Sequence, residues 1–220
     1  MKLVLASGSQ RRRELLTMCG YDYEIIVSNA DETIDESDPE SFVRALSFRK
    51  AKEVFDRLSA AGRRDFAVIG SDTVVAFQKE GGTKPVIIGK PKDAKDAVRI
   101  LSMLSGKTHR VFTGVSVIAD IPDENATAQC SIQEKAEIQT ECSITEVTFE
   151  TLSPDEIADY VNSGDPLDKA GSYGIQGPFG MFVREIRGNY FTVIGMPIPV
   201  LYKMLKKIGI LPHGFYERIE

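Results

Sequence analysis

The chain has 220 residues, of which 42% are hydrophobic, so it is long enough for one large domain or for two small lobes that share a core. Its formal net charge of −5 argues against a broad nucleic-acid interface, and no apolar stretch of about 18 residues could cross a membrane. The first residues lack a signal-peptide pattern, and the cysteines (Cys19, Cys130, Cys142) lack C-x-x-C spacing, so we expect a cytoplasmic protein without a disulfide framework or thiolate zinc site.

The N-terminal segment predicts a strand, a turn of small residues and a helix. Its apolar residues are followed by Ser7-Gly8-Ser9 and then by the basic residues Arg11, Arg12 and Arg13. Free N–H groups at a helix N-terminus, together with hydroxyl and guanidinium groups, favour the binding of an anion. A basic triplet can also be a solvated helix face, and the segment is neither a Walker A loop nor a dinucleotide fingerprint. An anion pocket is the hypothesis that the preceding turn favours.

A short strand at 23–27, an acidic loop with Glu32 and a long helix at 38–61 follow. Asp38 is the expected N-cap of this helix, and Pro39 suits its first turn. Lys50 lies at i, i+4 spacing in line with the apolar residues Leu46, Val54 and Leu58. A lysine there either reaches solvent along its stem or meets an anion.

Residues 66–77 are an apolar, β-branched run typical of a buried strand, and only Gly-Ser-Asp-Thr at 70–73 interrupts this run. A carboxylate in such a run is costly unless it has partners or marks a strand end that opens into a cleft, so Asp72 is a candidate functional residue. A hairpin loop at 78–84 leads to a strand at 86–88, and Lys90 follows it. Asp93 is the expected cap of a helix that runs to about Leu104.

In the second half we expect a strand at 111–119, a polar turn at 120–126 and one or two strands within 127–150. A capping box of Ser153 and Glu156 starts a helix that Gly164 ends. Strands at 181–186 and 190–194 would form a hairpin, and a last helix would span 199–208.

The glycine-rich segment 165–180 is too long to be a simple connector, and we interpret it as a binding loop. Asp168, Lys169 and Gln176 are its polar candidates, and Tyr173 offers a stacking surface. His109 is expected to be a structural hydrogen-bonding residue.

The polar residues that break local rules combine several cations with a few carboxylates. This combination suits a polyphosphate substrate, with carboxylates for a hard divalent cation and for the orientation or deprotonation of water. Because the chain has only two histidines, magnesium or manganese is expected before zinc. The candidates are Ser7, Ser9, Arg11, Arg12, Glu32, Lys50, Asp72, Lys90, Asp168, Lys169 and Gln176.

Several blocks closely resemble the Maf family of nucleoside triphosphate pyrophosphatases, in the family's order and over about residues 2–206. They are Ser7-x-Ser9-x-Arg11-Arg12, Gly70-Ser71-Asp72-Thr73, Gly89-Lys90-Pro91, residues 104–109 and the run from Asp168 to Gly177. The resemblance implies an α/β fold like that of inosine triphosphate pyrophosphatases, with an elongated mixed sheet, flanking helices and two lobes around a cleft. It also implies hydrolysis of a nucleoside triphosphate to the monophosphate and pyrophosphate.

The resemblance implies a role for each matching residue. Asp72 would be the base that activates water, Glu32 and Asp72 would belong to the metal site, and the phosphate-side cations would be Arg12, Lys50 and Lys90. Ser7 and Ser9 would support the phosphates, and Lys169 is expected to bind substrate. Arg11, Thr73 and Gln176 are the residues of the branch that acts on dTTP and UTP, whereas the 7-methyl-GTP branch has tryptophan, glutamine and glutamate there.

Two departures and several alternatives remain. Gln10 replaces the family's usual proline, and segments 78–86 and 121–142 look longer than in compact bacterial members. We expect a single domain over 1–210 with a tail at 211–220, and the sequence leaves a homodimer open. The main alternative is a nucleotide-sensing regulator of cell division, followed by a 7-methyl-GTP-type pyrophosphatase; a nucleic-acid binder is the weakest alternative, and no membrane partner is expected.

Overall fold

The computed structural model describes residues 1–78, 81–82, 84–121 and 136–214. Within these ranges a sheet of seven strands has the order β2-β1-β3-β5-β6-β7, with β4 paired to β3. β1 is parallel to β2 and β3, and the other pairs are antiparallel. The strands are β1 Lys2–Leu5, β2 Glu24–Ile25, β3 Phe66–Phe77, β4 Val86–Ile88, β5 Thr108–Asp120, β6 Ala136–Phe149 and β7 Val183–Arg187. The expected mixed α/β sheet is confirmed.

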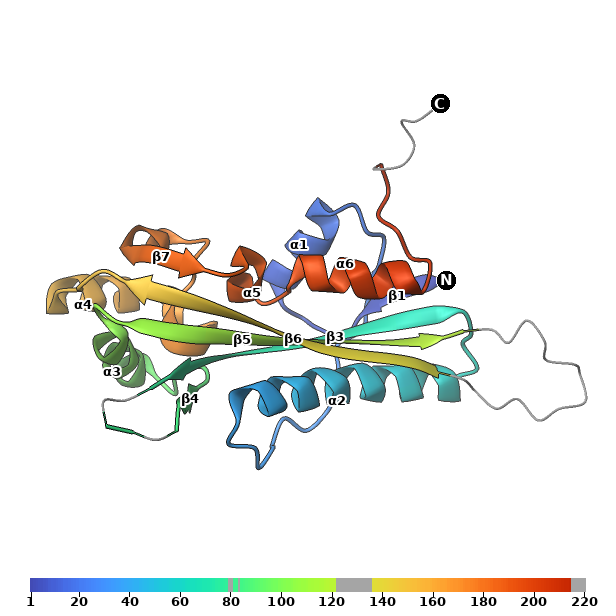
Figure 1. Cartoon of the computed structure of the whole chain (residues 1–220), viewed down its shortest axis with the longest axis horizontal. Helices are drawn as coiled ribbons and strands as arrows, with labels where there is room; N and C mark the ends of the chain where they lie inside the picture. The colour runs from blue at the N-terminus through green and yellow to red at the C-terminus, as the bar shows by residue number, and fades with distance from the viewer. Residues whose placement is uncertain (79–80, 83, 122–135, 215–220) are drawn as a thin grey trace, which may run out of the picture.

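Helices cover both faces of this sheet. They are α1 Gln10–Met18, α2 Pro39–Ala60, α3 Ala94–Leu104, α4 Pro154–Asn162, α5 Tyr190–Ile194 and α6 Ile198–Lys207, with 3-10 turns at Asp165–Asp168, Ala170–Ser172 and Pro178–Phe182. In the elongated molecule α2 lies along one face, and α1, α5 and α6 lie on the other, while α3 and α4 gather at one end (Figure 1). None of the helices described here is long and apolar enough to span a membrane.

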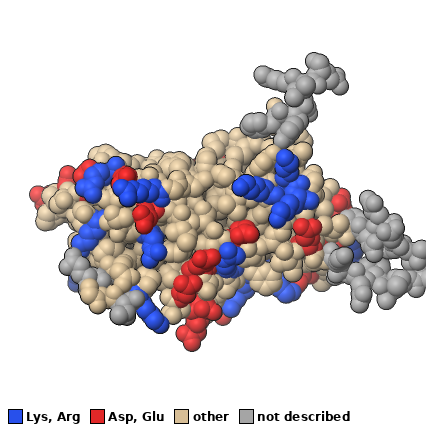
Figure 2. All heavy atoms as spheres, viewed as in Figure 1, with Lys and Arg blue, Asp and Glu red and all other residues tan. Residues whose placement is uncertain are grey.

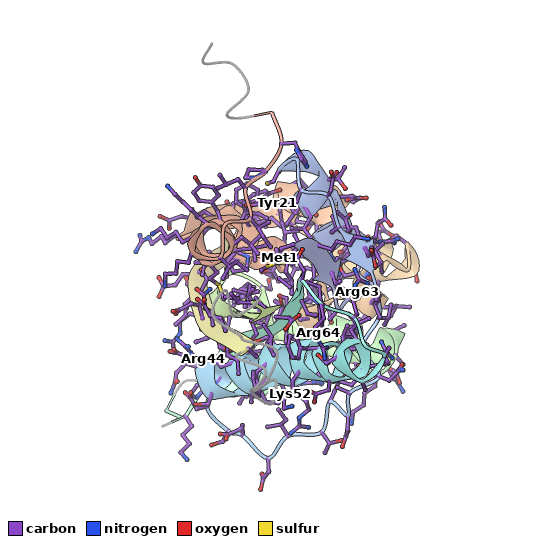
Figure 3. The ribbon with its side chains drawn as sticks, turned by 90° about the vertical axis from the view of Figure 1, so that its right-hand side faces the viewer. Met1, Tyr21, Arg44, Lys52, Arg63 and Arg64 are labelled. Atoms are coloured by element: carbon purple, nitrogen blue, oxygen red, sulfur yellow. The ribbon has the colours of Figure 1, made fainter. Side chains whose placement is uncertain are left out.

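Two glycines allow α2 to lie directly on the sheet. A Cβ at Gly70 of β3 would come within 2.2 Å of the Ser47 carbonyl oxygen, and one at Gly114 of β5 within 2.2 Å of the Val43 carbonyl oxygen. The helix backbone therefore touches the strand backbone at both places. Viewed along the molecule, α2 lies below the strands with Lys52 on its outer side, and the Arg44 guanidinium donates to the Thr140 carbonyl at its flank (Figure 3). This close approach places the cleft-side residues of α2 against β3.

Two large apolar clusters lie along the sheet. One joins β1, α1 and α6 to the middle strands through residues such as Leu5, Leu16 and Leu201. The other joins α3 and α4 to the opposite end of the strands around Leu104 and Phe149. Both clusters are built on the same long strands β3 and β5, so the surfaces between them are held by a continuous ladder of backbone hydrogen bonds.

The structure corrects two expectations. Residues 190–194 form helix α5 instead of the second strand of a hairpin, because the Asn189 side chain accepts from the Phe191 N–H and caps the helix. β7 pairs with β6 instead, from Glu146 to Phe149. The strand expected at 23–27 is only Glu24–Ile25, whereas the buried strand expected at 66–77 is confirmed as β3.

The other expected elements are confirmed with shifts of a few residues at their ends. The N-caps Asp38, Asp93 and Ser153 each accept from a backbone N–H of the first turn, and Ser153 and Glu156 form the expected capping box. Parts of the expected loop 78–84, the turn at 120–126, the start of the strand region after 127, Cys130 and the tail from 215 lie outside the described residues.

Candidate active site

The predicted site residues line one cleft of about 1240 Å³. Its walls come from the β1–α1 turn, α2, β3, the end of β4 and the loop after α4. The cleft residues among the predictions are Ser7, Ser9, Arg11, Arg12, Glu32, Lys50, Asp72, Thr73, Lys90, Asp168, Lys169 and Gln176. Segments far apart in the sequence therefore bring every predicted site residue to the same space, which is large enough for a nucleotide.

An ammonium group between two carboxylates lies in the cleft. Lys50 Nζ is 2.7 Å from Asp72 Oδ1 and 2.9 Å from Glu32 Oε1. The side chains of Lys50 and Asp72 are each 12% exposed, whereas that of Glu32 is 66% exposed. Lys50 thus meets anions, one of the two outcomes expected for its position, and the cost of burying Asp72 in β3 is offset by this pairing.

The acidic loop that carries Glu32 extends beyond the cleft. Figure 2 shows Asp and Glu side chains gathered over the segment that leads into α2. By sequence this segment contains Asp31, Glu32, Asp35, Glu36 and Asp38. The Arg49 guanidinium donates to the carbonyl oxygens of Asp31 and Thr33, both at 2.8 Å, so the loop is tied to α2 on both sides of Glu32.

Arg12 is held by three elements at once. Its Nε donates to the Gly195 carbonyl at 2.9 Å, one terminal nitrogen donates to Ser7 Oγ at 3.1 Å, and the other to Thr73 Oγ1 at 3.4 Å. Burial lowers the pKa of Arg12 and the Asp72 carboxylate opposes this, but an arginine stays charged at neutral pH. The guanidinium is thus a fixed positive charge beside Asp72.

Gly195 is a site residue that the sequence did not reveal. Its carbonyl oxygen also accepts from Ser71 Oγ at 3.0 Å, so β3 and α1 meet at one backbone group. Gly195 has a φ of 111° at the end of α5, where a Cβ would lie 3.1 Å from Thr73 Oγ1. A glycine after an apolar run is the only sequence signal, and recognising it requires α5 to be identified as a helix.

The turn before α1 differs in detail from the expectation. The Ser9 N–H donates to Ser7 Oγ at 3.2 Å, and the Ser9 side chain makes no cap bond to α1. Arg13 donates to the Gln10 side chain and is not among the residues that line the cleft. Of the three arginines, Arg11 and Arg12 face the cleft.

The glycine-rich loop forms the opposite wall. Gln176 is exposed at the cleft, and Lys169 is bonded to Asp165 and Asp168. Tyr173 is 6% exposed and packs edge-on against Phe149, with its hydroxyl 3.0 Å from His109 Nε2. Its ring is therefore largely buried in the core although it lines the cleft, so stacking on a base stays a prediction, whereas the structural hydrogen bond expected of His109 is confirmed.

The acidic side chains of the cleft suit a hard divalent cation that shares its ligands with the substrate. Mg²⁺ is commonly held by one or two carboxylates, waters and substrate phosphates. Glu32 and Asp72 converge on Lys50 from two elements and supply two such carboxylates. Within the described ranges, no three His, Cys, Asp or Glu side chains gather closely enough to hold a metal by themselves. The donor set therefore fits a metal that arrives with a polyphosphate.

Comparison with known sequences gives matches over nearly the whole chain. The family model described as Maf-like protein matches residues 2–208. A protein of Agathobacter rectalis named dTTP/UTP pyrophosphatase is 41% identical over 217 residues, which cover 95% of this chain and 98% of that protein. A protein of the same name from Bacillus thuringiensis subsp. konkukian is 43% identical over 210 residues, which cover 95% of this chain and 96% of the relative. The solved structure of the Staphylococcus aureus Ham1 protein is 13% identical, with a TM-score of 0.45 over 94% of this chain and 100% of that one.

Proposed function

The chain belongs to the Maf-like protein family, and we propose that it hydrolyses dTTP and UTP, and modified pyrimidine nucleotides, to the monophosphate and pyrophosphate. The observation that carries the proposal is the Lys50–Asp72 pair beside Arg12 in one cleft. A carboxylate next to fixed cations is what water activation beside a polyphosphate requires. The name of these relatives, dTTP/UTP pyrophosphatase, supplies the nucleotide class.

Asp72 is the proposed general base. Water forms a bond to phosphorus at the α–β bridge and gives a proton to Asp72, while the bond between that phosphorus and the bridging oxygen breaks and pyrophosphate leaves. Lys50 donates to Asp72 Oδ1 at 2.7 Å, which fixes the orientation of the carboxylate. A lysine in this place also offers its charge to the phosphates as they approach.

The proposed phosphate ligands differ in how firmly the protein holds their side chains before substrate binds. Arg12 is already oriented by Gly195, Ser7 and Thr73, so little side-chain entropy is lost on binding. Lys90 is exposed at the cleft after β4 and makes no ion pair with the described residues. Lys90 is therefore free to move onto a phosphate, and Ser7 and Ser9 complete this wall.

The pyrimidine would be recognised from the glycine-rich loop. The Gln176 amide can both donate to and accept from the edge of a thymine or uracil. Arg11 and Thr73 line the same cleft and match the branch that acts on dTTP and UTP. This set favours a pyrimidine triphosphate over the 7-methyl-GTP alternative.

A divalent cation, Mg²⁺ or Mn²⁺, is the proposed cofactor. Glu32 and Asp72 are the residues that would hold it, and bound there it would neutralise charge on the phosphates. We also propose one domain over 1–210 with a tail after it, and a cytoplasmic location. Gel filtration decides between a monomer and the homodimer that the sequence leaves open.

The test compares Asp72→Asn with Asp56→Asn. Asp56 pairs with Lys52 on the outer side of α2, so it matches the change in charge outside the cleft. Pyrophosphate release from dTTP and UTP is measured with Mg²⁺ or Mn²⁺ and after chelation, and circular dichroism checks the fold. We expect Asp72→Asn to lose activity by roughly 10²-fold or more and Asp56→Asn to retain it. Equal turnover of the two folded variants would refute the role of Asp72.

A further inference from the structure

Lys169 uses all of its donors inside the loop that carries it. An ammonium group has three N–H donors. Nζ donates to the Asp165 carbonyl at 2.5 Å, to Asp165 Oδ1 at 3.0 Å and to Asp168 Oδ1 at 2.8 Å. The side chain is only 13% exposed. A contact with a phosphate would cost one of these bonds, so the geometry does not favour the substrate-binding role expected for Lys169.

The lysine stem crosses the loop backbone at a glycine. A Cβ at Gly174 would come within 2.6 Å of Lys169 Cε and 2.9 Å of Cδ. The Gly174 N–H donates to Tyr160 Oη at 3.1 Å, and Tyr160 Oη donates to Asp165 Oδ2 at 2.5 Å. Tyr160 of α4 and Lys169 thus bind the same carboxylate from two sides. Gln176 follows two residues after Gly174, so this network also sets the position of the proposed base-reading amide.

Asp168 connects this network to the other wall of the cleft. One of its oxygens accepts from Lys169 and the other from Arg11, whose terminal nitrogen is 3.3 Å away. Burial alone would raise the pKa of Asp168, but the hydrogen bond and charge of Lys169, with the charge of Arg11, lower it. The carboxylate therefore stays ionised at neutral pH. Arg11 belongs to α1 and Asp168 to the loop after α4, so the pair spans the cleft.

We propose that Asp168 and Lys169 are positioning residues that hold Arg11 and the glycine-rich loop in place for the nucleotide. The proposal rests on the proposed function. Lys169 acts as an internal strut, because it holds the loop together through its bonds to Asp165 and Asp168. Asp168 in turn accepts from Arg11 and so fixes Arg11 relative to the loop; Arg11 is the position that differs between the branches of the family. The Arg11–Asp168 contact is a weak one, because the two side chains are 30% and 66% exposed. It can therefore open and close as nucleotide enters and leaves.

A double-mutant cycle tests the connection across the cleft. Arg11→Gln, Asp168→Asn and the double variant are compared for KM and kcat with dTTP, with Asp155→Asn on exposed α4 as the control. We expect Asp168→Asn to raise KM about two- to five-fold with little change in kcat, and to have a clearly smaller effect once Arg11 is replaced. Asp168→Glu should restore part of the loss. Additive effects, or a collapse of kcat, would overturn the positioning role.

A second measurement needs no turnover. If Lys169 is a strut, Lys169→Met lowers the melting temperature of the nucleotide-free protein by about 4 °C or more, since it leaves Asp165 without its cation and Asp168 with Arg11 alone. If Lys169 is instead a phosphate ligand, that melting temperature stays unchanged and only the affinity for a non-hydrolysable dTTP analogue falls. Neither melting nor analogue binding requires hydrolysis. If the wild-type protein releases no pyrophosphate, the proposed function is refuted, but these two measurements still decide whether Lys169 is a strut.

Discussion

His109 should make the folded protein sensitive to mild acid. The side chain is 2% exposed, its Nε2 lies 3.0 Å from Tyr173 Oη, and its Nδ1 makes no hydrogen bond to the described residues. The ring packs edge-on against Phe149 at 4.6 Å between centroids. Burial lowers the pKa of His109 from 6.5 to about 3. At a pH at which the unfolded chain protonates His109, the histidine therefore stays neutral in the folded state.

The size of the effect follows from proton linkage. Below pH 6.5 the unfolded state binds one proton more than the folded state, so the free energy of unfolding falls as the pH falls. Between pH 7 and pH 5 the loss from this one residue is about 2 kcal/mol, and it grows to about 4 kcal/mol by pH 3. The carboxyl groups with lowered pKa, such as Asp38 and Asp96, lose their contributions only at lower pH. The range from pH 7 to pH 5 thus separates the contribution of His109 from that of these carboxyl groups.

The assay is urea unfolding followed by circular dichroism at pH 7, 6 and 5 for the wild type and His109→Gln. The glutamine amide can still bond Tyr173 Oη but does not titrate. At pH 7 the free energy of unfolding of His109→Gln is expected to be lower than that of the wild type. Between pH 7 and pH 5 it is expected to fall by about 2 kcal/mol less than that of the wild type. His213 is exposed and present in both proteins, so it cancels in the comparison. Equal changes in the two proteins would refute the reasoning.

Two further substitutions test the packing of α2 and the reading of the base. Gly70→Ala should lower the free energy of unfolding by about 1–3 kcal/mol in urea unfolding and reduce pyrophosphate release, because its Cβ would meet the Ser47 carbonyl and displace the helix that carries Lys50; unchanged stability would contradict the direct contact. Gln176→Glu should weaken the use of dTTP and UTP relative to purine triphosphates in kcat/KM, because it removes the amide donor; an unchanged substrate ranking would mean that the base is recognised elsewhere.

The sequence predicted best those features in which one residue departs from the pattern expected of its helix, strand or turn. Asp72 in an apolar strand and Lys50 on an apolar helix stripe both stood out, and they lie 2.7 Å apart. The caps at Asp38 and Ser153 were recognisable because their signals are local. Whether these side chains carry the catalytic roles stays a prediction.

What the sequence could not reveal depends on contacts between distant segments. The aromatic and β-branched residues of 190–194 favour a strand by propensity, but the Asn189 cap and the pairing of β7 with β6 favour helix α5. Gly195 acts through its carbonyl oxygen, which leaves no side-chain signature. Gly70 showed in the sequence only as a break in an apolar run, whereas in the structure it is where α2 touches the sheet.

The support of Arg12 by Gly195 has a consequence for synthesis of the protein. Arg12 is synthesised 183 residues before Gly195, the residue whose carbonyl oxygen orients it. A nascent chain can form the helix that carries Lys50 long before Gly195, Lys169 and Gln176 exist. The wall of the cleft that carries Arg12 is therefore completed only after Gly195 has been synthesised, and fragments that end before Gly195 carry the early motifs without the support that orients Arg12.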